Sequence, residues 1–214
     1  MELKDDVNLI GVQEEIDKIW STIENSFNNN EITISSEKTL VFKFAWLLNS
    51  NHTLKPSNID FEAVLFSKSF SDGKFLDLYF EVEYEGESYR VGVEFKFPKK
   101  IINGSGGTEV RQKMINDLKK LDSLVQDGVI DLGVFLCATN EEYYLNLTRK
   151  TRSEGHFATY NGKKYEINTL YPVNTAYPHR LRLSSEISFN WRNPTLISHD
   201  YFSFLDPICI TPLD

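Results

Sequence analysis

The stretch FLDLYFEVEYEGESYRVGVEFKFPKK, residues 75–100, decides the fold, because it alternates in the way that two consecutive strands do. The glycine of the dipeptide Glu85-Gly86 suits the positive φ of a tight hairpin turn. A turn at that point makes one face of the strand pair wholly apolar. That face consists of Leu78 opposite Val93, Phe80 opposite Val91 and Val82 opposite Tyr89. A slip of either strand by one residue would turn its polar side chains into the core, so the register is strongly specified.

The second face of this hairpin is charged. In the same register Asp77 faces Glu94, and Lys96 lies further along that face. Directly opposed side chains have Cβ atoms about 5 Å apart, so the two carboxylates repel each other unless a positive charge lies between them. Lys96 is one candidate for that charge. A divalent cation is the other, because hard cations bind carboxylate oxygens.

A second interpretation of the same face is open, namely that it is the solvated side of the sheet. Glu81 faces Arg90, as expected for an ordinary pair of charges on the wet side of a sheet. The pattern Glu-x-Lys is common on solvated strands. The charged face is therefore either a solvated exterior or an active site, and Asp77 opposite Glu94 is the feature that favours a site.

The segments around the hairpin predict a mixed α/β domain. Ser35 or Ser36 suits the N-cap of the second helix, and Gly128 suits the end of the third. A strand, a long helix and a buried strand in that order predict a right-handed crossover between two parallel strands. The expected elements are helices at 13–27, 35–51 and 108–127 and strands at 61–70 and 129–138 around the hairpin.

The C-terminal part of the chain predicts a β-rich extension, at about 150–214. We expect a short helix in 141–150, a hairpin that turns at Asn161-Gly162, and a strand in 179–191. Basic residues outnumber acidic ones in 149–182, and tyrosines are interleaved with them. This pattern leads to the hypothesis that Lys163 and Lys164 touch a nucleic-acid backbone, with a solvated outer face as the alternative.

The order of elements and the charged residues together resemble the PD-(D/E)XK nuclease superfamily. Asp77 matches the acid on the second strand of that core, and Glu94-Phe95-Lys96 matches the Glu-x-Lys on the third. The resemblance covers roughly residues 35–138. One departure is Leu76, which stands where the motif often has proline.

The resemblance implies metal-dependent phosphodiester hydrolysis, with Asp77 and Glu94 holding Mg²⁺ or Mn²⁺ and the Phe95 carbonyl as a further ligand. Lys96 is then expected to orient or help deprotonate the attacking water and to stabilise developing charge. Members of the superfamily often bring a helical glutamate to the metal, and Glu37 is the candidate in this chain. Its alternative role is a favourable charge at a helix N-terminus. Phosphate contacts are expected from the first turns of the third helix, at Arg111, Gln112 and Lys113, with a solvated helix face as the alternative.

We therefore expect a single α/β domain, with a restriction endonuclease-like αβββαβ core whose mixed central sheet is flanked by helices. The leading functional hypothesis is a Mg²⁺-dependent nuclease, endo or exo, that acts on nucleic acid, with DNA as the expected substrate. The alternative is a catalytically inactive protein of the same fold that binds nucleic acid or protein, as an immunity protein does. A third possibility is an unrelated α+β protein whose hairpin has a wet face. A homodimer stays open, because many members of the superfamily dimerise.

Composition limits these hypotheses without deciding between them. The chain has 214 residues, a formal charge of −8 and 41% hydrophobic residues, enough to bury a core. An acidic chain is not a general nucleic-acid coat, but a nuclease needs only a local basic surface. Cys137 and Cys209 do not form a disulfide framework, and neither a signal peptide nor a membrane span is evident. A reduced, cytoplasmic protein is the expectation.

Overall fold

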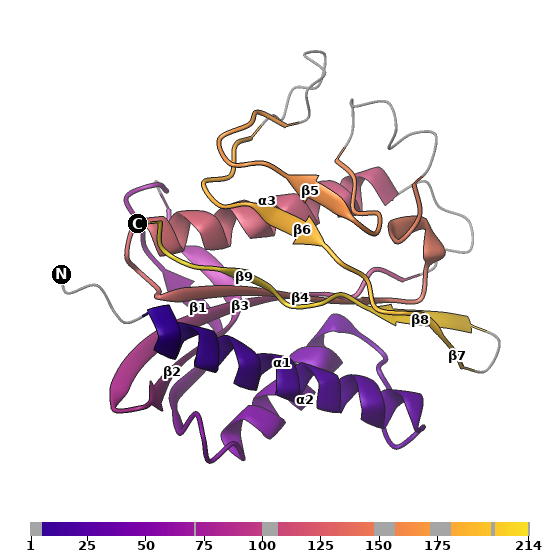
Figure 1. Cartoon of the computed structure of the whole chain (residues 1–214), viewed down its shortest axis with the longest axis horizontal. Helices are drawn as coiled ribbons and strands as arrows, with labels where there is room; N and C mark the ends of the chain where they lie inside the picture. The colour runs from indigo at the N-terminus through magenta and orange to yellow at the C-terminus, as the bar shows by residue number, and fades with distance from the viewer. Residues whose placement is uncertain are drawn as a thin grey trace.

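A computed structural model of the chain describes residues 6–70, 72–99, 107–147, 157–171, 181–197 and 200–213. It is an α/β structure in layers, with a seven-stranded mixed sheet between helices (Figure 1). Helices α1 and α2 pack on one face of the sheet, and α3 packs on the other beneath a small two-stranded sheet. The helices are α1 Asp6–Asn28, α2 Glu37–Asn49 and α3 Gly107–Gln126, with a 3-10 turn η1 at Glu142–Tyr144. The strands are β1 Pro56–Leu65, β2 Lys74–Tyr84, β3 Glu87–Lys96, β4 Leu132–Thr139, β5 Lys163–Tyr165, β6 Ile187–Phe189, β7 Thr195–Ile197, β8 Asp200–Phe204 and β9 Ile208–Ile210.

The β2–β3 hairpin has the predicted turn and register. Glu85 and Gly86 occupy the turn with φ of 51° and 83°, the left-handed values that a primed hairpin turn requires. The three apolar pairs of the sequence prediction are register partners. Their side chains are all buried against α1 and α2. The hydrophobic alternation alone was therefore enough to place this hairpin and its inward face.

The two N-terminal helices form where the apolar periodicity predicts them. Ser36 caps α2, since its side-chain oxygen accepts a hydrogen bond from Thr39 N at 3.2 Å. Trp20 of α1 is fully buried and donates its indole N–H to Leu205 O at 2.9 Å. The indole therefore joins α1 to the segment between β8 and β9 without leaving its polar atom unpaired.

The crossover between β3 and β4 is also present. The two strands pair in parallel, with Glu94 beside Phe135 and Lys96 beside Cys137 in the register. All eight residues of β4 are buried, as expected for a strand covered on both faces. The Cys137 thiol is buried, as the apolar run around it predicted. None of the helices in the described ranges is long and apolar enough to cross a membrane.

The C-terminal part differs from the prediction. A turn does lie at Asn161-Gly162, where Lys163 N donates to Tyr160 O at 2.9 Å, but the expected local hairpin is wrong. The short strand β5 pairs with the distant β6 instead, because Tyr165 and its partner Ile187 bury their side chains in the α3-side core. Strands β8 and β9 pair with β4 and so complete the main sheet rather than forming a separate layer.

Smaller boundary differences have local causes. The strand expected at 61–70 runs instead over 56–65, because its pairing with β2 continues past a bulge near Asn58. Of the helix expected in 141–150, the described residues 141–147 form only the short turn η1, and of the strand expected in 179–191, the described residues 181–191 include a strand only at 187–189. Most basic residues of 149–182 lie outside the described residues, namely Arg149, Lys150, Arg152 and Arg180.

Candidate functional site

Charged side chains from four elements meet at the open end of the β2–β3 hairpin, the end farthest from its turn. The strands carry the residues that the sequence singled out, and two helices supply the rest. Contacts between these residues make them one electrostatic cluster rather than separate surface charges. We call this set the carboxylate–lysine cluster: Glu37 of α2, Asp77 of β2, Glu94 and Lys96 of β3, and Asp117 and Lys120 of α3.

The strands separate at this cluster, and the separation positions Asp77. The last register pair of β2 and β3 is Leu78 with Val93, so Asp77 lies just beyond the paired ladder. Its carboxylate oxygen Oδ2 accepts a hydrogen bond from Phe95 N at 2.7 Å, a donor that the ladder no longer uses. Asp77 therefore holds the diverging strands together, and it does not face Glu94 as a ladder partner.

A break in the alternation of β2 accompanies this separation. Leu76 belongs to the core on the α3 side and Leu78 to the core on the α1–α2 side, although residues two apart share a face in a regular strand. Gly92 leaves the space for this arrangement, since a Cβ there would lie 2.7 Å from Leu76 Cδ1 and 2.9 Å from Ile130 Cδ1. The strand thus turns at Asp77, which is the residue between the two leucines.

Glu94 is the most buried acid of the cluster, with 2% of its surface exposed. Lys120 Nζ lies 2.6 Å from Glu94 Oε1 and compensates its charge, although this oxygen has no directed hydrogen bond within the described part of the chain. Burial, with the nearby carboxylates of Asp117 and Asp77, raises the pKa of Glu94 to about 8 against the attraction of Lys120. A carboxyl in this state favours a proton or a closer cation.

Lys96 is the centre of the contacts on the other side of the cluster. Its ammonium donates to Phe95 O at 2.9 Å and lies 3.0 Å from Asp117 Oδ2 and 3.5 Å from Glu37 Oε1. Burial opposes the charged form of Lys96, but Asp117, Glu37 and Asp77 together raise its pKa above the usual value. Lys96 is therefore held as a cation, so in this arrangement it is a charge-stabilising group and not a base.

Glu37 lies in the first turn of α2 and reaches the cluster from the opposite layer. Its Oε2 atom accepts a hydrogen bond from Phe97 N at 3.1 Å, which ties the helix N-terminus to the end of β3. Burial raises the pKa of Glu37, and Asp77 adds to this effect while Lys96 opposes it. The carboxylate thus acts within the cluster as well as at its helix terminus.

The two residues that the sequence analysis missed, Asp117 and Lys120, come from α3. They lie next to the buried residues Leu118 and Leu121, on the flank of the helix that crosses β3. Lys120 Nζ is 3.4 Å from Asp117 Oδ1 and donates to Phe75 O at 2.8 Å. The sequence did contain a pattern that could have indicated them. Residues at i and i+3 share one side of a helix, so a polar pair next to the buried stripe lies at the edge of the helix–sheet contact.

The oxygens of the cluster are of the kind that Mg²⁺ prefers, namely carboxylates and a backbone carbonyl. Among the residues that the structure describes, however, no three His, Cys, Asp or Glu side chains are grouped as a ready metal site. Lys120 and Lys96 stand beside the carboxylates and supply the positive charge. The donor chemistry therefore fits a divalent cation, and its binding requires the lysine contacts to rearrange.

The predicted nucleic-acid contacts on α3 differ in their exposure. Arg111 is fully buried, where its Nε donates to Phe157 O at 2.8 Å and its guanidinium lies 4.5 Å from the Tyr143 ring. Gln112 is half-buried, and the exposed Lys113 pairs with Glu109 at 3.0 Å on its own helix. Arg111 is thus a structural residue here, and only its two neighbours reach the surface.

Lys163 and Lys164 lie on β5, above α3 in Figure 1. The ammonium of Lys163 is 4.8 Å from the centre of the Tyr165 ring and 5.3 Å from that of Tyr171. Lys164 makes an exposed ion pair with Glu186 at 3.9 Å. Both lysines therefore belong to the layer outside α3, and Lys164 reaches the solvent.

Two hollows lie along α2. The first, of about 370 Å³, is lined by two acids of the cluster together with residues of α2 and β1. Its lining residues are Glu37, Lys38, Val41, Phe42, Phe61, Glu62 and Asp77.

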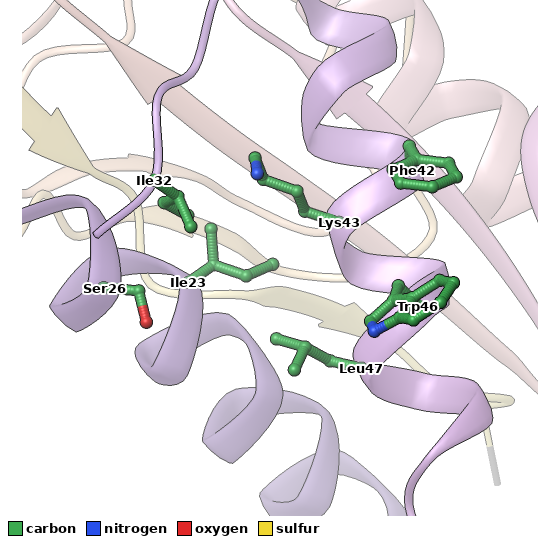
Figure 2. Close-up of a pocket in the computed structure, with 7 residues that line it drawn as sticks. All are labelled: Ile23, Ser26, Ile32, Phe42, Lys43, Trp46 and Leu47. Atoms are coloured by element: carbon green, nitrogen blue, oxygen red, sulfur yellow. The ribbon is translucent and has the colours of Figure 1, made fainter. Parts of the chain in front are cut away.

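The second hollow, of about 410 Å³, is mostly apolar and lies between α1 and α2 (Figure 2). Its lining residues are Ile23, Ser26, Ile32, Phe42, Lys43, Trp46 and Leu47. The first hollow opens beside the cluster, and the second shares only Phe42 with it.

No family model, curated protein or solved structure matches this chain. Similarity therefore assigns it to no family. The chemistry of the cluster has to be argued from its residues and their geometry.

Proposed function

We propose that this protein is a metal-dependent nuclease that hydrolyses phosphodiester bonds, with the carboxylate–lysine cluster as its active site. The observation that carries the proposal is the state of Glu94, a buried acid whose pKa is raised to about 8 beside Asp117, Asp77 and Lys120. A buried carboxyl among like charges is costly unless a cation or a reaction requires it. Perturbed groups of this kind cluster at functional sites.

The order of elements supports the same proposal. The segment from α2 to β4 runs helix, three strands, helix, strand, and its last strand returns parallel to the third. This order is that of the αβββαβ core of restriction endonuclease-like enzymes. We infer that the chain has this core, with Asp77 on its second strand and Glu94 and Lys96 on its third.

In this proposal Asp77, Glu94 and the Phe95 carbonyl would hold Mg²⁺ or Mn²⁺, which when bound would supply an activated water and offset charge on the phosphate. Lys96, held as an ammonium by Asp117 and Glu37, stabilises the negative charge that develops on the attacked phosphate. Glu37 orients Lys96, because its two oxygens contact that ammonium and the Phe97 N–H.

Lys120 has a separate role in the proposal. Its ammonium compensates Glu94 and Asp117 while no metal is bound. With a divalent cation bound, Glu94 and Asp117 would no longer need this ammonium, and Lys120 would be available to contact a substrate phosphate. The long, flexible lysine side chain suits such a change better than a fixed guanidinium does.

The decisive experiment is a cleavage assay on plasmid, linear duplex, single-stranded DNA and RNA, with Mg²⁺, Mn²⁺ or chelator. We expect cleavage that requires the metal and is lost in Glu94→Gln and Lys96→Met. The exposed Glu83, which pairs with Lys55 near the hairpin turn, gives the control Glu83→Gln, and this variant should cleave as the unchanged protein does. Cleavage that persists in both cluster variants would reject the site.

A second candidate function is a non-catalytic protein of the same fold that binds nucleic acid or protein. The observation that favours it is the present arrangement of the cluster, in which Lys120 already compensates Glu94. This candidate predicts no cleavage of any substrate with either metal. Binding of an oligonucleotide that is equally strong with metal and with chelator would support it.

Further nucleic-acid contacts are proposed for Gln112, Lys113, Lys163 and Lys164. Neutralising a lysine that contacts phosphate reduces the slope of log affinity against log salt by roughly one per contact. Lys163→Gln with Lys164→Gln should therefore flatten the salt dependence of oligonucleotide binding. An unchanged slope would remove β5 from the interface.

A further inference from the structure

The hollow beside the cluster has aromatic walls that the proposed hydrolysis does not use. Phe42 of α2 and Phe61 of β1 both line it, and they are 61% and 48% exposed. Because both rings are largely exposed, they are not core residues, and core packing does not explain why two phenyl rings lie here. The same hollow is lined by Glu37 and Asp77, which are members of the carboxylate–lysine cluster. Any ligand in the hollow therefore lies next to the proposed reaction centre.

The chemistry of the lining selects among ligands. Its volume of about 370 Å³ is in the range of small-molecule sites. Aromatic side chains stack on the faces of nucleobases whatever the base, and carboxylates accept hydrogen bonds from exocyclic amino groups. A base is neutral, so it tolerates the acids of the hollow, whereas a second phosphate there would be repelled by them.

We propose that this hollow is a subsite for one unpaired nucleobase, adjacent to the phosphodiester bond held at the cluster. The inference rests on the proposed nuclease function and names its substrate class. A base inside a duplex is stacked and paired and cannot enter such a hollow without being turned out. The preferred substrate is therefore single-stranded nucleic acid, or an unpaired nucleotide in a loop, flap or end.

The neighbouring aromatic residue extends the subsite and provides a probe. Trp46 lies one turn beyond Phe42 on the same side of α2, with ring centres 6.1 Å apart (Figure 2). Its ring is largely exposed, so a base that stacks on Phe42 changes the surroundings of Trp46. The indole fluorescence of Trp46 reports on the subsite, since Trp20 and Trp191 are buried.

The test measures binding without cleavage, with the full chain in Ca²⁺ or in chelator. The probe is a single-stranded oligothymidylate that carries one 2-aminopurine, and the same oligonucleotide in a duplex is the comparison. The variants are Phe42→Leu and Phe61→Leu, which keep an apolar side chain but remove the ring. Phe66→Leu is the matched control, because Phe66 is exposed on the same edge of the sheet but does not line the hollow.

We expect the fluorescence of 2-aminopurine and of Trp46 to be quenched when a single strand binds. Binding to the duplex should be at least about tenfold weaker. Removal of each ring should lower the affinity for single strands by about tenfold. Phe66→Leu should bind as the unchanged protein does. Folding of each variant is checked by its unfolding midpoint in urea.

Three results would overturn the inference: duplex binding as tight as single-strand binding, ring variants that bind like the control, or no binding of oligonucleotide at all. Quenching of Trp46 by a short arginine peptide but not by the oligonucleotide would also overturn it and would make the hollow a cation site. Failure of the nuclease proposal has a different signature. Ring-dependent binding of single strands without cleavage under any metal removes the hydrolysis and keeps the base subsite.

Discussion

The two ends of the β2–β3 hairpin carry charges on the same strands but treat them differently. Near the turn, Arg90 forms a two-pronged pair with Asp131, with both distances at 3.0 Å, and Lys55 pairs with Glu83 at 2.9 Å in solvent. Each base there has its own acid. At the open end Glu37, Asp117 and Glu94 share Lys96 and Lys120, and Glu94 is buried. The ion pairs near the turn are thus separate from one another, whereas those at the open end are joined.

Under the proposed function, this difference separates a structural use of charge from a functional one. Exposed pairs contribute little to stability, typically about 0–1 kcal/mol, and a fold can gain or lose them without consequence. A buried acid with unmatched neighbours costs stability, so its presence indicates a use beyond the fold. The five predictions that follow test this contrast.

The largest effect is expected from Glu94→Gln, which keeps the shape of the side chain but removes a carboxyl that can ionise and bind a metal. Metal-dependent cleavage should fall by about 100-fold or more, the size found when one charge-stabilising group is removed from an active site. Single-turnover rates on a single-stranded oligonucleotide measure it. Asp131→Asn at the turn end is the control and should cleave normally. Equal loss in the two variants would mean that the two ends do not differ.

Lys96→Met should lower the cleavage rate by roughly 30-fold, because the ammonium beside the reacting phosphate is lost. The variant also leaves Asp117 and Glu37 without their shared cation, so its unfolding in urea has to be measured beside the rate. Lys96→Arg, which keeps the charge, should recover part of the rate. A cleavage rate in Lys96→Met as high as that in Lys96→Arg would exclude an electrostatic role for Lys96.

Stability should depend on pH through Glu94. Its pKa is about 8 in the folded chain and has a usual value of 4.5, so the folded state keeps a proton that the unfolded state loses. The contribution of Glu94 to the free energy of unfolding should therefore be highest below about pH 4.5. It should fall by on the order of 2 kcal/mol as pH rises to 8. Urea unfolding of the unchanged protein and of Glu94→Gln at pH 5, 6.5 and 8 measures the difference. A constant difference over this range contradicts the burial effect.

Lys120→Met should increase the affinity for Mn²⁺ by roughly tenfold, because it removes the positive charge that stands beside Glu94 and Asp117. Calorimetric titration of the protein without substrate measures this affinity. Lys119→Met is the neighbouring control on α3, since Lys119 pairs with Asp122 and does not contact the cluster. An unchanged affinity in Lys120→Met would show that its ammonium does not compete with the metal.

The smallest effect is expected from Arg90→Met at the turn end. The pair of Arg90 with Asp131 is partly exposed, so its loss should cost about 1 kcal/mol or less of unfolding free energy. Cleavage should not change. A loss well above that size, measured in urea, would mean that the turn end is as dependent on its charges as the open end is.

The hairpin could be predicted from the sequence because its rules are local. Alternation, one glycine at the turn and the like-charge conflict of Asp77 with Glu94 define the strand pair and direct attention to its open end. How the strands resolve this conflict was not predictable. The strands part at Leu78, and Asp77 turns to the Phe95 N–H, because backbone groups freed by the separation need partners.

The contributions of α3 and of the C-terminal strands could not be predicted from local sequence patterns. Asp117 and Lys120 join the cluster only because the crossover places α3 over β3, and this depends on tertiary packing. Arg111 was expected at the surface because it is charged, but it is covered by Phe157 and Tyr143. The pairing of β5 with β6 joins segments that no turn connects, so no short-range signal could indicate it.

The position of β4 has a consequence for how the chain folds as it is made. β4 is buried along its whole length, and among the described strands β8 and β9, which are synthesised much later, cover one of its edges. All residues of the carboxylate–lysine cluster precede β4, so they leave the ribosome before this edge is covered. A chain that stops before residue 200 keeps the cluster intact in sequence but presents a bare apolar strand edge, a template for aggregation. Incomplete copies of this protein are therefore expected to aggregate through the unpaired edge of the sheet.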